Sequence, residues 1–508
     1  MKKLIILLNF IIIFHWLSSL SVVGQNRNLI WCFGDSSGID FTNLQNPIPI
    51  ATGMDARGSC TSIADTSGNL LFYASTSDPL LLSYDELVFI RNASNQVISN
   101  GDSIVGLNWY QELTITQDPA NSNLFYLFSI GVTDSYGLYY TVVDMSLNGG
   151  LGGVIQKNVQ LENFKVVDCL KAIKHGNGRD LWIIIRNALN FSNEHYVYLI
   201  SPLGISSSFT QSIGSVHHTN SGRYCFSADG SKLVYINLIG LMEIYDFDRC
   251  TGIISNPVTI HPEPSTAPYG RFWSCEFSSN GRFLYVATND NSATKYLYQY
   301  DLLSSNPATS RISLTSNSNY LIGYGFLKRG PDDKIYFSTA YQCDAFPYCY
   351  PYPDSVYNQY NMNLSVINSP DSLGLACNFT PYSFYLGGKR TYYGLPNNPD
   401  YDMPALVGSP CDTLVGISEA SPSIITQQLN LFYHPDWQTT FINASNLSGT
   451  KGTMEIFDVQ GKLVHQEEIE IVNGYYTRNF NMTGMANGMY FVNLISAGQR
   501  LSGKLVKE

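Results

Sequence analysis

A short apolar strand pattern recurs six times along this chain and limits the fold more than any other feature. Successive copies lie 53, 57, 52, 51 and 51 residues apart. A near-constant period of this length indicates a repeat protein, in which each repeat is one supersecondary unit. The copies are "NLLFYAS", "NLFYLFS", "DLWIIIR", "KLVYINL", "FLYVATN" and "KIYFSTA", with Leu71, Leu124, Leu181, Leu233, Leu284 and Ile335 at equivalent positions.

Each copy is the second strand of a unit with four short strands. An apolar run and a turn such as "ADGS" or "SSNGR" precede it, and a third strand follows, clearest in "EIYDFD" and "YLYQYD". A fourth strand usually comes next. Short strands rich in aromatic and β-branched residues predict β-propeller blades rather than helical repeats. Six complete units fit between about Ser59 and Phe379.

Both ends of the repeat region carry further strands. "NLIWCFG", "SGIDFTN" and "PIPIAT" predict three strands before the first unit, and "TYYGLPNN" (Thr391 to Asn398) predicts one after the last. Together they make a seventh blade that closes the ring and hides its edges. We therefore expect an all-β fold with a seven-bladed β-propeller over residues 26–404; six or eight blades are the alternatives.

Polar residues recur at the strand ends of these units. Such side chains hydrogen-bond to the backbone ahead of them and hold a turn, so we interpret them as turn formers and not as a catalytic set. After the third strands they are Asn92, Asp144, Ser201, Asp248, Asp301 and Asn368, and around the first turns they are Asp65, Asp118, Asp180, Asp229 and Asp333.

The pattern changes after the propeller. Residues 405–424 have a linker's composition, and residues 425–508 contain two hairpins, "TMEIFDVQGKLVHQEEIEI" and "MANGMYFVNLISAGQRLSGKLVKE". Their alternating faces predict a small Ig-like β-sandwich.

Four short motifs stand out in this region: "LFYHPDW", "IFDVQGKLV", "NGMYFVNL" and the terminal "KLVKE". With Tyr433, Pro435, Gly461, Gly488, Tyr490 and Val492 as the matching residues, the region resembles the type A C-terminal sorting domain of cargo of the Bacteroidetes type IX secretion system. "LFYHPDW" departs from the family's first motif, Tyr-Pro-Asn-Pro, while the other three agree with the family. The resemblance implies export through the Sec system, then secretion across the outer membrane by the type IX machinery, and a location in the medium or on the outer cell surface.

The propeller region is also similar to a family of Bacteroidetes surface proteins. The similarity covers most of residues 28–398 and includes "WCFGDSSGIDF", "KHGNGRDLWIII", "FDRCTGIISNP" and "YGLPN". It implies a propeller at the cell surface and implies no particular chemistry.

Residues 1–24 have the layout of a secretory signal peptide: Lys2 and Lys3, an apolar run, and a tail of small residues. No later segment is long and apolar enough to span a membrane.

The chain has 10 cysteines, and export to an oxidising compartment allows them to form disulfides. Cys343 and Cys349 are the closest pair in sequence. Cys250 is expected to bond a cysteine of an adjoining blade, and Cys275 is a further candidate.

The formal net charge of −11, without any basic run, argues against a nucleic-acid partner. The sequence has no CxxC motif, and its histidines lack ligand spacing around the cysteines, so we expect no metal and no cofactor.

One long loop is the main recognition candidate. Strand connectivity places "AYQCDAFPYCYPYPDSVYNQYN" on the same propeller face as the "SVHHTNSG" segment. Tyrosine supplies a large amphipathic contact surface at low entropy cost. We expect a binding or adhesion module for a glycan or protein. The alternatives are an extracellular enzyme acting on polysaccharide or peptide, or a structural surface component. The candidate ligand-binding residues are Tyr348, Tyr350, Tyr352, Tyr357, His217 and His218.

Overall fold

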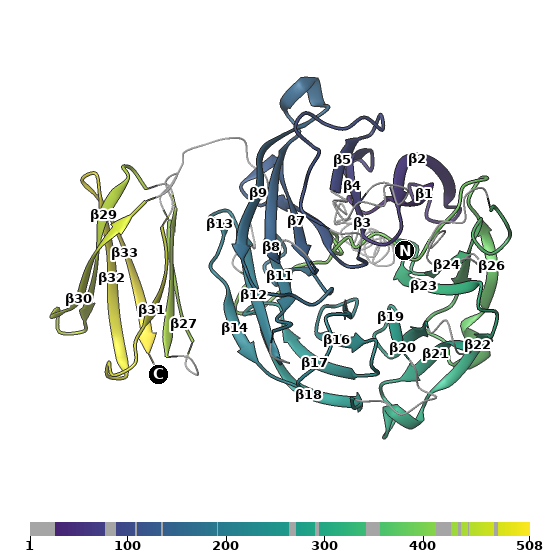
Figure 1. Cartoon of the computed structure of the whole chain (residues 1–508). Helices are drawn as coiled ribbons and strands as arrows, with labels where there is room; N and C mark the ends of the chain where they lie inside the picture. Colours follow the sequence, from purple (N-terminus) through teal and green to yellow (C-terminus); the bar gives the residue numbers. More distant parts are fainter. Residues whose placement is uncertain are drawn as a thin grey trace, which may run out of the picture.

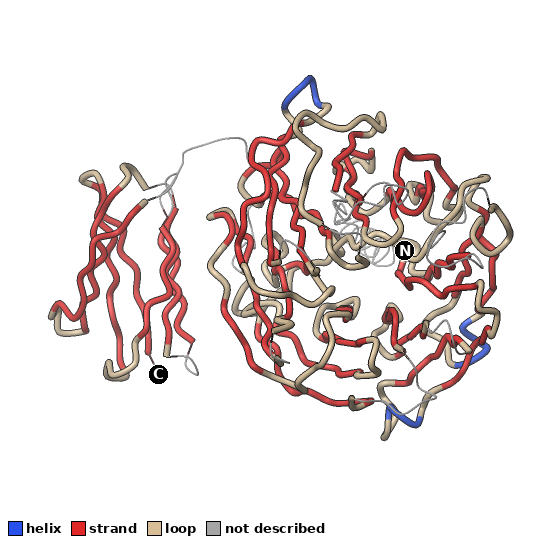
Figure 2. Tube along the Cα trace, in the orientation of Figure 1, coloured by secondary structure: helices blue, strands red, loops and turns tan. Residues whose placement is uncertain are grey.

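The computed structural model describes residues 26–76, 88–106, 109–133, 136–189, 192–263, 271–289, 294–341, 356–412, 428–434, 438–445, 447–471 and 476–507. Within them the regular structure is almost entirely β and forms two bodies (Figure 1). Sheets arranged around a common centre form the larger body, and two sheets form the smaller one (Figure 2). The predicted all-β propeller followed by a β-sandwich is confirmed.

Six sheets of the propeller follow one another in chain order, each built from consecutive antiparallel strands. The first strand of each sheet contacts the first strand of the next, which places these strands around the centre. The strands are β3 (Cys60–Ala64), β4 (Leu70–Thr76), β5 (Val88–Asn92); β6 (Leu113–Asp118), β7 (Asn121–Gly131), β8 (Gly137–Asp144), β9 (Gly153–Glu162); β10 (Lys171–Lys174), β11 (Leu181–Arg186), β12 (Glu194–Ser201), β13 (Gly204–Ile205), β14 (Phe209–Ser212); β15 (Gly222–Phe226), β16 (Lys232–Asn237), β17 (Met242–Asp248), β18 (Ile253–His261); β19 (Phe272–Phe277), β20 (Phe283–Thr288), β21 (Lys295–Asp301), β22 (Ile312–Asn317); β23 (Ile322–Arg329), β24 (Ile335–Tyr341), β25 (Asn363–Ile367) and β26 (Phe379–Tyr385). Three short 3-10 helices lie in connections: η1 (Leu147–Gly150), η2 (Pro307–Thr309) and η3 (Gly374–Cys377).

The seventh sheet differs from the predicted closing blade. Two N-terminal strands form it, β1 (Ile30–Asp40) and β2 (Ile48–Ala56), instead of three. The first two predicted strands are one, because a bulge at Asp35 to Ser37 bends it without ending it. Counting this sheet, the described strands of the propeller form seven sheets. Since the seventh has only two strands within that part of the chain, the number of blades stays a prediction.

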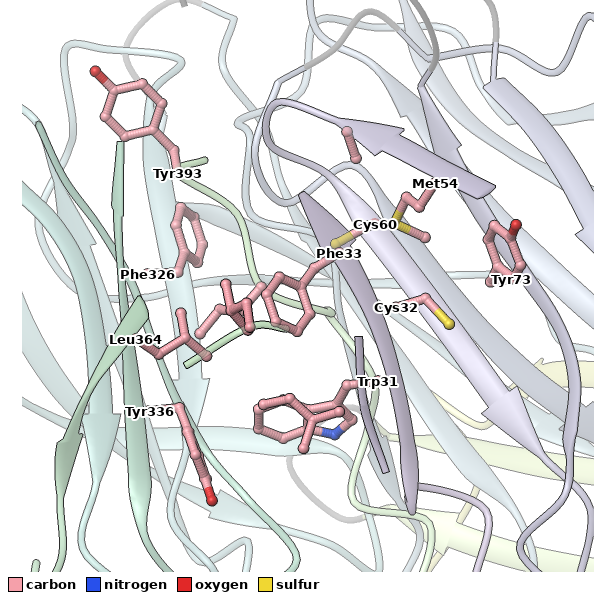
Figure 3. Packing of buried hydrophobic residues seen from close by; sticks show 14 of the residues in the cluster. Trp31, Cys32, Phe33, Met54, Cys60, Tyr73, Phe326, Tyr336, Leu364 and Tyr393 are labelled. Atoms are coloured by element: carbon pink, nitrogen blue, oxygen red, sulfur yellow. The ribbon is translucent and has the colours of Figure 1, made fainter. Parts of the chain in front are cut away.

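The β1–β2 sheet is held by an aromatic core. The Trp31 ring lies 4.9 Å from that of Phe41 and 5.8 Å from that of Tyr336 in β24. Figure 3 shows Trp31 on the side of β1 that faces Tyr336, and Cys32 on the opposite side, toward Tyr73. Side chains alternate along a strand, so β1 fills the spaces toward both neighbouring sheets. Trp31 and Cys32 have no exposed surface.

The predicted C-terminal strand of the closing blade is instead a strap through the middle of the propeller. We call residues 391–404 the channel strap. Only Arg390, just before it, forms a bridge with Asp35 of β1. Gly34 permits this approach, since a Cβ there would stand 2.6 Å from the Arg390 carbonyl oxygen. Pro396 cannot donate to a strand ladder, which favours the turn of the chain into the centre.

Asn397 ties the channel strap to three sheets. Its backbone amide donates to the Cys60 carbonyl (2.8 Å). Its side-chain amide donates to the carbonyls of Leu113 (3.0 Å) and Leu170 (2.8 Å), and its side-chain oxygen accepts from Lys171 (2.9 Å). One asparagine thus satisfies polar groups at the centre that the sheets cannot pair among themselves.

A disulfide fixes the chain where it leaves the centre. Cys250, at the turn between β17 and β18, is bonded to Cys411, and Gly176 packs against the two sulfurs. The expected bridge from Cys250 to a cysteine of an adjoining blade is therefore wrong. Cys275 is a buried free thiol. The Leu406 amide donates to the Gly176 carbonyl (2.7 Å), so the first residues of the predicted linker pack on the propeller.

The interpretation of the repeated polar residues as turn formers is confirmed for most of them. The carboxylate of Asp248 accepts from the Cys250 amide (2.8 Å), and that of Asp301 accepts from the Leu303 amide (3.1 Å). Asn92 caps its turn in the same way, accepting from the Ser94 amide (3.0 Å).

The smaller body contains a three-stranded and a four-stranded sheet. Its buried core includes Tyr490 and Val492, while Gly461 lies in the turn between β29 and β30 with a φ of 79°. Tyr433 is the next-to-last residue of β27, Pro435 lies outside the described residues, and Gly488 begins β32. The strands are β27 (Gln428–His434), β28 (Thr439–Ser445), β29 (Lys451–Asp458), β30 (Leu463–Glu470), β31 (Tyr476–Asn481), β32 (Gly488–Ser496) and β33 (Gln499–Lys507).

Candidate functional site

The predicted recognition loop falls largely outside the described residues. Tyr348, Tyr350 and Tyr352 lie there, as do Cys343 and Cys349. Tyr341, at the end of β24, precedes this stretch, and the described chain resumes at residue 356. The remaining candidates, Tyr357, His217 and His218, have defined positions.

His217 is a core residue. It is 1% exposed, and its ring nitrogens lie 2.8 Å from the carbonyl oxygens of Asn187 and Thr219. Burial and the nearby Arg186 guanidinium lower the pKa of His217 to about 4. This imidazole faces the protein interior and is neutral at pH 7.

His218 points the other way. Its side chain is 56% exposed, and Nδ1 lies 2.7 Å from Glu263 Oε2. The other Glu263 oxygen accepts a bond of 2.5 Å from the Asn237 amide. The two histidines diverge, as neighbours on an extended segment do. Within the described ranges, no group of three His, Cys, Asp or Glu side chains is placed to hold a metal ion.

Tyr357 is exposed and held in one orientation. Its hydroxyl donates to Asp35 Oδ2 (3.1 Å), and the Arg390 guanidinium lies 4.6 Å from the centre of its ring. Arg390 also forms an ion pair of 2.8 Å with Asp35. Burial and the adjacent Asp35 carboxylate raise the pKa of Tyr357, so the phenol remains protonated. Tyr357 is 47% exposed although Asp35 and Arg390 hold it in place.

Three half-buried tyrosines form an aromatic group at the base of the predicted loop. We call Tyr341, Tyr360 and Tyr382 the tyrosine cluster. The rings of Tyr341 and Tyr360 are nearly parallel, at 4° with centroids 6.1 Å apart. Tyr382 in β26 meets Tyr360 edge to face at 5.2 Å. Parallel offset and edge-to-face arrangements are the favoured geometries of aromatic pairs.

The backbone at Tyr382 is unusual. Its φ is 51°, the left-handed region that bulky residues rarely occupy, and it is the one aromatic residue with positive φ in the described part of the chain. A register shift between Leu364 and Val366 places two extra residues on β26 here, and Ser365 Oγ accepts from the Tyr382 amide (3.0 Å). Bulges re-aim side chains, and this one turns Tyr382 onto Tyr360.

The segment 356–361 is braced by asparagines. The Tyr360 amide donates to the Asn358 side-chain oxygen (2.9 Å), and the Asn358 amide donates to that of Asn361 (2.9 Å). The Asn361 side-chain amide in turn donates to the Val356 carbonyl (2.8 Å). This network of Asx-type hydrogen bonds holds the backbone that carries Tyr357 and Tyr360 in one conformation.

The opposite face of the propeller carries a cavity of about 320 Å³ at the end of the channel. Its walls come from the ends of β10, β15 and β23, the turns that follow β15 and β23, and the channel strap. This is the face of the turns between first and second strands, whereas the predicted site lies on the face of the loops between second and third strands.

Two lysines line this cavity. Lys171 Nζ donates to Asn397 Oδ1 (2.9 Å), and Lys328 Nζ donates to the Asn398 carbonyl (3.1 Å). Neither amine forms an ion pair with a carboxylate of the described chain. Burial and, next, the charge of Lys171 lower the pKa of Lys328 to about 7.

Acidic side chains border the cavity and are held by other groups. Glu276 accepts from the Arg329 backbone amide (3.1 Å), and the Cys225 thiol donates to it (3.4 Å). The Arg329 side chain pairs with Asp333 (3.0 Å) and Asp400 (3.4 Å). The hydrogen bond with Cys275 and burial raise the pKa of the Cys225 thiol, which argues against a reactive thiolate.

Residues 434–508 match the family model described as the secretion system C-terminal sorting domain. The C-terminal domain is a sorting domain. The sorting domain confirms the predicted location: it marks proteins that are secreted and attached to the outer cell surface. It also implies the secretion machinery as a partner. No described helix has the length and hydropathy of a membrane span.

Several solved propellers have low similarity to this chain. The periplasmic gluconolactonase PpgL of Pseudomonas aeruginosa is 13% identical, with 81% of this chain and 99% of that chain covered and a TM-score of 0.35. A quinonprotein alcohol dehydrogenase-like protein of Bacteroides thetaiotaomicron is 10% identical, with 73% of this chain and 76% of that chain covered and a TM-score of 0.35. The β-propeller domain of Cps50 from Myceliophteria thermophila is 9% identical, with 62% of this chain and 93% of that chain covered and a TM-score of 0.30. No curated protein sequence matches significantly. At these scores the similarity says nothing about the chemistry of this chain.

Proposed function

We propose that the protein is a surface-displayed binding module that recognises glycans through the tyrosine cluster and Tyr357. The observation that supports this most is the left-handed backbone of Tyr382. A strained conformation costs about 1–3 kcal/mol and persists only where surrounding contacts over-determine it. Here the strain directs an aromatic ring onto a stacked pair beside an exposed tyrosine.

Tyrosine rings suit a sugar ligand. The C–H face of a pyranose packs on an aromatic face, and the phenol hydroxyl bonds to sugar hydroxyls. Asp35 and Arg390 beside Tyr357 add an acceptor and donors at the same place. The asparagine network around Tyr360 reduces the entropy lost on binding, because these side chains are already ordered.

The described geometry favours a binding site over an enzyme on this face. Catalysis by an acid and a base needs converging ionisable groups with pKa values near the working pH. His217 is turned inward with its pKa lowered to about 4, while His218 pairs with Glu263 at the surface. These groups diverge instead of converging on one point.

A glycan array screened with the full secreted chain tests the proposal, with Tyr341→Ala and Tyr360→Ala as variants. We expect either change to weaken capture of the bound glycan by about tenfold or more, as loss of a buried aromatic contact does. Tyr296→Ala is the matched control, because Tyr296 stacks on Tyr298 at 5.1 Å in a different sheet. Equal capture by all variants would overturn the proposal, as would binding to a surface protein with no glycan bound.

A further inference from the structure

A second cavity lies on the turn face of the propeller, and we call it the basic cavity. Its volume of about 380 Å³ is at the lower end of the range for small-molecule sites. Its walls come from the β6–β7 turn, the end of β10 with the turn that follows, Arg27 and Tyr401 of the channel strap. It shares no described lining residue with the cavity that Lys171 and Lys328 border, so it is a separate site.

Positive side chains outnumber negative ones in the lining of the basic cavity. Among the described residues, three cations face one carboxylate; they are Arg27, Lys174, Arg179 and Asp118. The Asp118 oxygens accept from a backbone amide of their own turn (2.7 Å) and from the Tyr126 hydroxyl (3.1 Å). This carboxylate therefore holds its turn and forms no ion pair within the described chain, and the lining is net positive.

Two of the cations are buried and are bonded to neutral oxygens. Arg27 and Lys174 are each 6% exposed. Arg27 Nη1 donates to the Ala64 carbonyl (3.2 Å), and Lys174 Nζ donates to the Tyr401 carbonyl (2.8 Å). Arg27 Nε has no acceptor within the described chain, and neither side chain forms an ion pair there. A guanidinium and an ammonium carry more N–H donors than these bonds use, so both have donors left for a ligand.

The carboxylates close to these cations are held by other groups. Asp180 pairs with Arg179 through Nε (2.6 Å) and Nη2 (3.2 Å), and Nη1 takes no part in this pair. Asp65 accepts from the backbone and side-chain amides of Asn69 (2.9 and 3.0 Å). Asp400 pairs with Arg329 (3.4 Å). None of these three carboxylates lines the basic cavity in the described chain.

The buried cations keep their charge at neutral pH. Burial lowers the pKa of Lys174 to about 8, and the charge of the nearby Asp402 opposes this shift. The amine is therefore largely protonated at pH 7. A buried charge that lacks a counter-charge is costly, and an anion bound beside it recovers part of that cost.

The arrangement of the cations favours an anion with three terminal oxygens. Arg27 precedes β1, Lys174 ends β10, and Arg179 lies in the β10–β11 turn, so the donors come from three separate segments. A sulfate or phosphate ester can offer one oxygen to each donor, whereas a carboxylate has only two oxygens. The cavity also exceeds the volume of a bare ion, and Gln117 and Ser122 in its lining suit the hydroxyl groups of a sugar.

We propose that the basic cavity binds the sulfate or phosphate ester group of a small sugar. The ester oxygens accept from Arg27, Lys174 and Arg179, and the sugar lies toward Gln117 and Ser122. This site does not depend on the glycan-binding proposal, because the tyrosine cluster lies on the other face of the propeller.

Calorimetric titration of the full chain with galactose 6-sulfate and galactose 6-phosphate tests the site. We expect at least one ester to bind, and galactose and galacturonate to bind at least tenfold more weakly. Galactose has no anionic group, and the anionic group of galacturonate has only two oxygens. The ester that binds more tightly identifies the source of the oxyanion. No heat from either ester at millimolar concentration would overturn the proposal, as would equal binding of galactose. Equal binding of galacturonate would overturn the choice of a three-oxygen anion.

The variants Lys174→Met and Arg179→Gln each remove one charge from the cavity. We expect Lys174→Met to weaken binding of the ester at least tenfold and Arg179→Gln to weaken it severalfold. Lys328→Met is the matched control, since Lys328 also donates to a carbonyl of the channel strap but lines the other cavity.

Unchanged affinity in both cavity variants would overturn the assignment, as would an equal loss in the control. If Lys174→Met fails to fold, Arg179→Gln supplies the measurement, because the Arg179 side chain is 41% exposed and its loss leaves the interior intact.

Discussion

One end of the propeller channel is closed by packed side chains, and the other end opens into a cavity. At one end Tyr110, Trp273, Phe326 and Tyr393 pack around the Arg223 guanidinium, which lies 5.2 Å from the Tyr110 ring. Arg223 pairs with the fully buried Asp168 at 2.7 Å. At the other end Lys171 and Lys328 bond only to neutral oxygens and border a cavity.

The difference shows how one segment produces two environments. The channel strap enters the centre with Tyr392 and Tyr393 and continues with Asn397, Asn398 and Asp400. Its aromatic part packs beside a buried, matched charge pair, which holds sheets together. Its polar part satisfies backbone groups and accepts hydrogen bonds from two lysines that form no ion pair within the described chain. The cation at the closed end is therefore held by a buried ion pair, whereas the two at the open end are held by neutral oxygens of the strap.

Asp168→Asn, at the closed end, is expected to cause the largest loss of stability. The carboxylate accepts the Tyr110 and Gln111 amides as well as Arg223, so its loss leaves a buried guanidinium without a counter-charge. We expect a loss of about 4 kcal/mol in the free energy of unfolding, measured with urea. Asp102→Asn, in an exposed ion pair, should change it by less than about 1 kcal/mol. If both variants changed the free energy of unfolding by similarly small amounts, the closed end would not have the stabilising role expected of it.

Cys411→Ser should have the next largest effect. The disulfide joins residues 161 apart in sequence and restricts the unfolded chain, so we expect a loss of about 3 kcal/mol. Non-reducing mass spectrometry of peptides should find Cys250 and Cys411 linked in the wild type. A linked peptide of Cys250 with any other cysteine would refute the pairing.

Asn397→Ala breaks the contacts that join the strap to β6 and to the residue before β10. Two carbonyls, those of Leu113 and Leu170, would lose their donor. The expected loss is about 2 kcal/mol, since unsatisfied buried groups cost about 1–3 kcal/mol. Hydrogen exchange should become faster in β6 and β10 than in β19. Uniform exchange rates would show that Asn397 does not link these strands.

Lys328→Met should have the smallest effect and the opposite sign. Its folded pKa of about 7 lies below the unfolded value of 10.5, so the unfolded chain binds the proton more tightly. The lysine therefore lowers the free energy of unfolding by its full amount below pH 7, and this loss becomes smaller as the pH rises toward 10.5. We expect the variant to be about 1 kcal/mol more stable than wild type at pH 6, with the gain shrinking at pH 10. A variant less stable at pH 6 would contradict this sign.

The repeat and the alternation of side chains were enough to predict the propeller, the sandwich and the turn-forming roles of residues such as Asp248. The path of residues 391–404 could not be predicted, because "TYYGLPNN" has the composition of an edge strand. Its insertion depends on polar groups of three sheets that meet only in the folded centre. Lys171 and Lys328 are unremarkable in sequence, since Lys171 begins β10 and Lys328 is the next-to-last residue of β23. The predicted pairing of Cys250 failed because Cys411 lies in a segment with a linker's composition.

The bond between Cys250 and Cys411 also determines how the propeller carries load. A protein attached to the cell surface through its C-terminal part comes under tension along its chain when its propeller is pulled away from the cell. Tension arriving at residue 412 passes through the disulfide into the turn between β17 and β18. The hydrogen bonds of Asn397 and Asn398 are then shielded, so force cannot draw residues 391–404 out of the centre one contact at a time. Under reducing conditions the same force would act directly on those contacts, and the ring would open at its centre first.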